Sequence, residues 1–177
     1  MKSLKALIGG LGEESWMRRV LSAKDLAKIG PGARGALPAL IAAVADEDEL
    51  VRVESIAAIR MIGLSSEAIP ALIRALRDES KLVAGQASGA LGQASERIAD
   101  EAVPALIRAM RDECDPVRMR ASVALAIMGS PAVPALTVAL EDENPEVREA
   151  ALRALQKIEE NATKSAQQTA KEQPCDS

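Results

Sequence analysis

Residues 37–40 read Leu-Pro-Ala-Leu, and this tetrapeptide recurs as Ile-Pro-Ala-Leu at 69–72 and as Val-Pro-Ala-Leu at 103–106 and 133–136. The prolines of successive copies are 30 to 34 residues apart. Self-similarity at a period of this size is the sequence signature of a stacked repeat protein. Each repeat buries its apolar face only against its neighbours, and such stacks mostly bind other molecules on an extended surface.

Each unit predicts two antiparallel helices, A and B. The proline fits the first turn of helix A, where a missing N–H costs nothing, and the apolar residues after it have helical spacing. An acidic turn follows, as at 46–49, and its carboxylates favour the positive N-terminal end of helix B. Helix B follows the pattern Val-Arg-x-x-Ala-x-x-Ala-Leu-x-x-Ile-Gly, and Gly30, Gly63 and Gly129 fit a left-handed cap at its end.

A further unit precedes the first proline, because residues 18–30 fit the helix B pattern and residues 4–11 fit a helix A. Residues 1–160 therefore predict five helical hairpins, with units at about 1–33, 34–66, 67–101, 102–131 and 132–160. Residues 161–177 are polar and without periodicity, and we expect a disordered tail there.

The whole pattern resembles HEAT repeats, in particular the short bacterial type named after phycobilisome lyase subunits. The resemblance covers residues 1–160. It implies an all-α, armadillo-like, right-handed α-solenoid of about five antiparallel helical hairpins, with the B helices lining the concave surface. The repeated motifs indicate this fold and leave the partner open.

Composition excludes several classes of function. With no histidine among 177 residues, the chain cannot form a Ser-His-Asp triad, a Cys-His dyad or a histidine-based zinc site. Cys114 and Cys175 lie far apart, so we expect neither a thiolate cluster nor a structural disulfide, and the default is a reducing compartment. The sequence therefore predicts no catalytic residues, no metal and no cofactor.

Charge and hydropathy limit the cellular environment and the class of partner that we expect. The net charge of −4 argues against nucleic acid as the main partner. No stretch approaches the roughly 20 apolar residues that a membrane span needs, and the N-terminal apolar run is short and interrupted by glycines. We expect a soluble, cytoplasmic protein with no membrane partner.

A pair of charges repeats along the chain. An acidic residue lies five positions before the start of each helix B: Glu13, Asp46, Asp78, Asp112 and Asp142. The second position of helix B is Arg19, Arg52, Arg118 or Arg148, with Ala84 as the exception. Evenly repeated charges can pair between neighbouring units and cap helix ends, so we interpret them as structural.

The third, seventh and tenth positions of helix B form a separate helical stripe, which should face the groove. In the middle units this stripe is apolar or bare, and it is our predicted binding surface: Val53, Ala57, Arg60, Gly85, Gly89, Gly92, Met119, Val123 and Ala126. The three glycines would let a partner approach the backbone closely. The alternative is that they allow closer packing of adjacent B helices.

Two further features have structural and functional interpretations. Arg74 and Arg77 align with Arg108 and Arg111 one unit later, as a solvated face or as a patch for an acidic partner or a phosphate backbone. Trp16, the only aromatic residue, either seals the end of the core or anchors a partner.

The predicted function is a non-catalytic scaffold that binds another protein, a peptide or a second copy of this chain in the groove. Two alternatives stay open. One is an accessory subunit of a larger enzyme complex, like the bilin lyase subunits that share this repeat. The other is weak nucleic-acid binding through the arginine patch.

Overall fold

A computed structural model describes residues 3–172 of the chain. This part forms ten α-helices and three short 3-10 helices, with no strand. The A helices are α1 (Leu4–Gly10), α3 (Leu37–Ala43), α5 (Ile69–Ala75), α7 (Glu96–Ala109) and α9 (Val133–Ala139). The B helices are α2 (Trp16–Ile29), α4 (Glu49–Ile62), α6 (Lys81–Gly92), α8 (Asp115–Met128) and α10 (Pro145–Glu172). The 3-10 helices η1 (Gly30–Ala36), η2 (Ser66–Ala68) and η3 (Ser130–Ala132) precede α3, α5 and α9.

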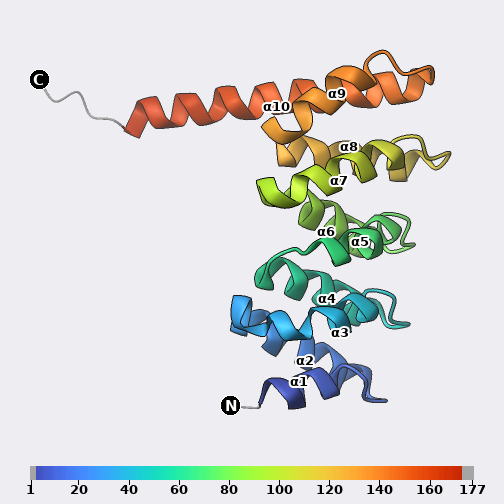
Figure 1. Cartoon of the computed structure of the whole chain (residues 1–177), viewed down its shortest axis with the longest axis vertical. Coiled ribbons are helices and arrows are strands. Elements are labelled where there is room, and N and C mark those ends of the chain that lie inside the picture. The colour runs from blue at the N-terminus through green and yellow to red at the C-terminus, as the bar shows by residue number, and fades with distance from the viewer. Residues whose placement is uncertain (1–2, 173–177) are drawn as a thin grey trace, which may run out of the picture.

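The five hairpins stack in chain order into an elongated α-solenoid, with α1 and α10 at opposite ends of the stack (Figure 1). The predicted fold class is thereby confirmed. Successive B helices contact one another more extensively than successive A helices do. The B helices are therefore the more closely packed row of the stack.

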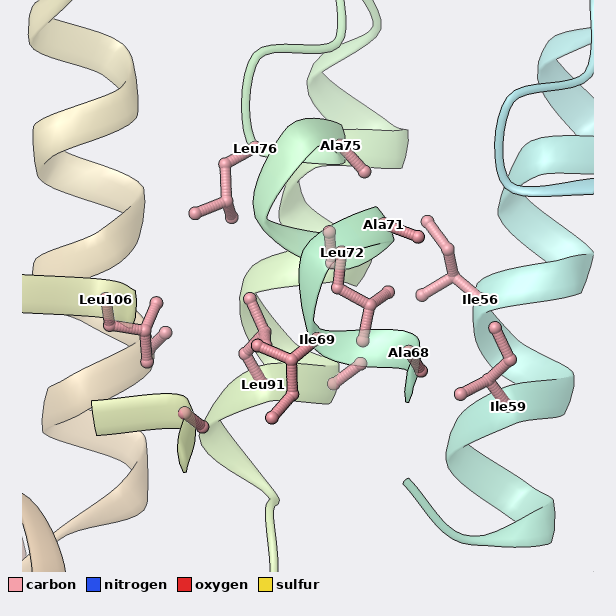
Figure 2. Close-up of a cluster of buried hydrophobic side chains, with 14 of the residues drawn as sticks. Ile56, Ile59, Ala68, Ile69, Ala71, Leu72, Ala75, Leu76, Leu91 and Leu106 are labelled. Carbon is pink, nitrogen blue, oxygen red and sulfur yellow. The ribbon is translucent and has the colours of Figure 1, made fainter. Parts of the chain in front are cut away.

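Small and branched aliphatic side chains fill the core between the layers. Figure 2 shows α5 between α4 and the helices of the next units, with Leu72 and Leu91 among the buried side chains. Both are fully buried, and so is Leu106 of α7. Alanines such as Ala68 alternate with these larger residues, so the helices pack closely without any aromatic side chain.

Arginine clamps hold the first layers together. Arg52 donates from Nη1 to the carbonyl oxygens of Asp46 and Glu47 in its own turn, at 3.0 and 3.1 Å. Its Nε and Nη2 reach both carboxylate oxygens of Asp78 in the next unit, at 2.8 and 3.0 Å. Arg19 reaches the next unit through Nη2 alone, which donates to Asp46 at 2.8 Å and to Glu47 at 3.3 Å. The predicted pairing between neighbouring units is confirmed at these two steps.

The clamp changes where the third unit carries Ala84 in place of arginine. Arg77, in the turn after α5, pairs with Asp112 instead, and Arg111, in the turn after α7, pairs with Asp142 one unit later. Arg118 keeps the contacts to its own turn but pairs with Glu146 of α10 at 3.0 Å. In the C-terminal half, the turn that follows helix A therefore supplies the arginine that reaches the next aspartate.

Two boundaries differ from the sequence prediction. We expected Pro104, like the other repeat prolines, to lie in the first turn of helix A, but α7 begins at Glu96 and contains Pro104 in its interior. The earlier start is favoured because Ala99 and Ala102 are buried against the core. Prolines 38, 70 and 134 do lie in the first turn of their helices, as predicted.

The second difference concerns the C-terminal segment. We expected a disordered tail from residue 161, whereas α10 continues as a helix to Glu172 and projects beyond the stack (Figure 1). Residues 161–172 contain neither glycine nor proline and are rich in alanine, glutamine and lysine, which have high helix propensity. Residues 173–177 of the predicted tail lie outside the described part.

The ends of the B helices agree with the sequence. Gly30, Gly63 and Gly129 have φ values of 62°, 111° and 76°, a region that favours glycine. Trp16 begins α2 and is 45% exposed at the N-terminal end of the stack. Within residues 3–172 no single helix is long and apolar enough to cross a membrane, although α8 and the segment Ser130–Ala139, bent by 119°, reach that length and composition as a pair.

The clamp predicts an asymmetric mutational response. The Arg52 and Asp78 side chains are only 10% and 13% exposed, so Arg52→Met leaves a nearly buried carboxylate and two turn carbonyls without their donor. We expect the free energy of unfolding to fall by about 2–4 kcal/mol in urea titrations followed by circular dichroism. Arg153→Met removes only an exposed pair with Glu149 and should cost less than about 0.5 kcal/mol. Equal effects of both changes would contradict the clamp.

Asp142 predicts a dependence of stability on pH. The backbone N–H of Asn144 and the guanidinium of Arg111 both donate to its carboxylate and hold its pKa below the ordinary value. Because the folded protein then binds this proton more weakly than the unfolded chain, the stabilisation is present above about pH 4 and is lost as the pH falls below it. Asp142→Asn should flatten the fall in unfolding free energy between about pH 5 and about pH 3; an unchanged slope would exclude this role.

Candidate partner-binding surface

One face of the B helices carries a row of exposed apolar side chains, which we call the B face. Seven large apolar residues belong to it: Met17, Leu50, Met61, Leu82, Met119, Val123 and Ile127. Each is 46–56% exposed. On α8 three of them follow one another at intervals of four residues, so they share one side of the helix.

Bare backbone lies in the middle of the B face. Gly85 is exposed and Gly89 half-buried, and a Cβ built on either would meet nothing within 4 Å. The neighbouring B helices contribute Ala57, which is half-buried, and the exposed Met119 and Val123. These five predicted residues are at the surface, and α6 forms a shallow strip without side chains between α4 and α8.

Three predicted surface residues are buried instead. Val53 and Ala126 face neighbouring B helices, and Gly92 lies against α8. A Cβ on Gly92 would come within 2.6 Å of the Cβ of Ile127 and 2.9 Å of the carbonyl oxygen of Ala124. Close packing of adjacent B helices therefore explains Gly92, as the alternative interpretation held, whereas it does not explain Gly85 or Gly89.

The sequence interpretation missed part of the B face. Met17, Leu50 and Leu82 lie one position before the helix B pattern begins, and Met61 and Ile127 lie at its eleventh position. A helical face includes positions three, seven and eleven residues after its first member, so the predicted stripe was right at its third and seventh positions and too short. Met61 and Ile127 border it at the eleventh position, and extending it back to the residue before the pattern would have added Met17, Leu50 and Leu82.

A cavity of about 540 Å³ adjoins the row between α8 and α10. Apolar side chains, among them Met119, Val123 and Ala154, line it. Charged residues of both signs on α10 also line it: Glu146, Glu149, Arg153 and Lys157. This end of the B face can therefore accept an apolar side chain and distinguish the charges on either side of it.

The four predicted patch arginines divide into two pairs. Arg77 and Arg111 are engaged by Asp112 and Asp142. Arg74 and Arg108 are exposed and make no hydrogen bond or ion pair within residues 3–172. Arg60, predicted on the stripe, is exposed but lines a different cavity at the edge of the stack.

In the described part of the chain, no cluster of side chains supports metal or redox chemistry. No group of three His, Cys, Asp or Glu side chains there could hold a metal ion. Cys114 is a free, exposed thiol at the start of α8.

Comparison with known proteins identifies the family to which this architecture is similar. A family model for HEAT repeats matches residues 4–91 and 69–156. Among curated proteins no significant match is found.

Solved structures share the fold. A chain from the complex of CpcE and CpcF of phycocyanin lyase from Nostoc sp. PCC7120 is 25% identical with a TM-score of 0.57, and the match covers 89% of this chain but only 65% of that one. An engineered protein is 22% identical (TM-score 0.53; 89% and 80% covered). A designed armadillo repeat protein in complex with the peptide (KR)4 is 19% identical (TM-score 0.52; 99% and 94% covered).

The glycines of α6 predict opposite responses to the same substitution. Gly92→Ala forces a methyl group into Ile127, so we expect the free energy of unfolding to fall by about 1–2 kcal/mol. Gly89→Ala meets nothing within 4 Å and should gain up to about 1 kcal/mol from helix propensity. Urea titrations of the two variants measure the difference, and the same sign for both would contradict the distinction between packing and surface glycines.

Proposed function

This chain belongs to the HEAT repeats family, and we propose that it is a non-catalytic scaffold that binds a segment of another protein along the B face. The row of seven half-exposed apolar side chains is the observation that carries the proposal. Exposed apolar side chains that gather on one face of a folded protein are typical of an interaction site.

The chemistry of the B face favours an apolar segment of the partner. Burying the exposed half of one such side chain contributes roughly 1 kcal/mol, so affinity depends on several of them acting together. Three of the seven are methionines, whose flexible thioethers adapt to irregular surfaces. The bare backbone at Gly85 and Gly89 lets the partner's own backbone or a bulky side chain approach α6.

Charged side chains lie at the two ends of the B face. Lys24 and Lys28 are exposed on α2, and α10 carries Arg153 and Lys157 at the equivalent positions, with Glu149 one turn before them. The middle of the face is apolar and its ends are polar, which is the usual arrangement of a specific protein interface. A partner with an apolar centre and charged flanks fits this distribution.

A second candidate function rests on the likeness to the chain from the CpcE and CpcF complex of phycocyanin lyase. Here the partner would be another subunit of an enzyme complex, with this chain as an accessory to its chemistry. Co-expression with a bilin-synthesising system separates the two candidates. A coloured complex that co-purifies with this chain would favour the accessory role, and a colourless chain would remove it.

The scaffold proposal predicts that capture of the partner depends on the B face alone. Gly89→Leu fills the bare strip and Val123→Glu places a charge in the apolar row, so each should abolish capture from an extract of the source cells. Val138→Glu is the matched control, because Val138 is 76% exposed on α9, outside the B face. The bound proteins are identified and their affinities measured by calorimetry with the purified partner.

Folding of each variant is checked by circular dichroism. The expected result is that the wild type and Val138→Glu retain the same protein, while Gly89→Leu and Val123→Glu bind it at least tenfold more weakly. A second copy of this chain would appear as a concentration-dependent dimer that Val123→Glu dissociates. Retention of the partner by both B-face variants would refute the proposal.

A further inference from the structure

Two adjoining cavities lie away from the apolar row of the B face, one where α4 and α6 end beside the start of α7 and the other between α5 and α7. The first, of about 600 Å³, is lined by Arg34, Arg60 and Arg97. The second, of about 550 Å³, is lined by Arg74, Arg77 and Arg108. Both cavities share Ser66 and Glu101, whose side chains form a 2.8 Å hydrogen bond. We call the two cavities together the arginine groove.

Most of these guanidinium groups have no partner of their own. Arg77 pairs with Asp112, while Arg34, Arg60, Arg97, Arg74 and Arg108 make no hydrogen bond or ion pair within residues 3–172.

Two of the three acidic residues of the groove are already engaged. Glu101 accepts from Ser66, and Asp112 pairs with Arg77. The groove therefore concentrates unpaired positive charge in a chain whose net charge is −4.

The three arginines of the first cavity lie at positions where the repeat pattern does not call for arginine. At the position of Arg60 the other units carry alanine, glycine or glutamine. Arg34 lies in η1, which is longer than η2 and η3, and Arg97 lies in the N-terminal extension of α7. Three irregularities of separate segments thus bring arginines to one cavity, although stacking of the units requires none of them.

We propose that the arginine groove binds an acidic linear segment of a partner protein. Arginine pairs with carboxylates through two parallel hydrogen bonds, and unpaired guanidiniums on both cavities can hold carboxylates on both halves of one segment. Ile69, Ile73 and Ile98 line the same cavities and offer a surface for an apolar side chain between them. An extended segment of about six residues spans roughly 20 Å, which is about two interhelical spacings.

A peptide fits the groove better than a nucleic acid does. The groove contains Glu67, Glu101 and Asp112 as well as arginines, so a uniform row of phosphates would meet carboxylates inside it. A peptide can place its carboxylates at the arginines and its neutral residues elsewhere. The apolar lining also has no use in contacts to a phosphate backbone.

The test is fluorescence polarisation with a labelled peptide in which pairs of glutamates flank a leucine. We expect the full-length chain to bind it, and the variants Arg34→Gln/Arg97→Gln and Arg74→Gln/Arg108→Gln each to bind at least tenfold more weakly. Peptides with glutamine for glutamate, or with glycine for leucine, should also bind more weakly. Since the substituted arginines are exposed and unpaired, circular dichroism should show an unchanged fold.

Matched controls separate the groove from general electrostatics and from the B face. Arg18→Gln/Lys164→Gln removes the same charge from exposed positions elsewhere and should bind the peptide like the wild type. Val123→Glu, which disables the B face, should also leave the affinity for this peptide unchanged. Equal binding by the wild type and both groove variants, or equal binding of the glutamine peptide, would overturn the inference. Tighter, strongly salt-dependent binding of duplex DNA would overturn it in favour of nucleic acid.

Discussion

The fold depends on an arginine that joins two turns at once. Arg52 satisfies carbonyl oxygens of its own turn and the carboxylate of the next unit's Asp78, so one side chain fixes both the hairpin and the step to its neighbour. The core between layers consists of small aliphatic side chains, which exert no strong directional preference. The clamp supplies that direction, and the row of B helices, with its exposed apolar side, follows from it.

The third unit shows how the stack tolerates loss of this residue. With Ala84 at the clamp position, Arg77 in the turn after α5 binds Asp112 instead, and Arg111 in the turn after α7 binds Asp142 in the same way. Halfway along the chain, the arginine that links the layers therefore comes from the turn before helix B and no longer from helix B itself. Arg77 and Arg111, which the sequence placed in one patch with Arg74 and Arg108, are engaged in these ion pairs. Only Arg74 and Arg108 stay available for other contacts.

The sequence predicted the repeat well and the surface less well. The prolines at 38, 70 and 134 and the capping glycines marked helix ends, because local backbone rules decide those positions. Pro104 led to a wrong prediction for the start of α7, because burial of Ala99 and Ala102 outweighs the local preference of proline for a first turn. Gly89 and Gly92 look alike in sequence, and only the position of Ile127 separates a surface glycine from a packing glycine. The repeat predicted a patch with Arg74 and Arg108, but which residues share a cavity depends on three-dimensional stacking, so the sequence did not join Arg34, Arg60 and Arg97 to it.

Trp16 determines what tryptophan fluorescence can measure when this protein unfolds. It is the only aromatic side chain in the chain and begins the first B helix at one end of the stack. Its fluorescence therefore senses the terminal hairpin alone, whereas circular dichroism averages over every helix. In a linear array stabilised by nearest-neighbour contacts, the interval between the two transitions measures how strongly one layer holds the next. Because the core contains no aromatic residue, the single tryptophan is an optical probe of the end of the stack, where fraying begins.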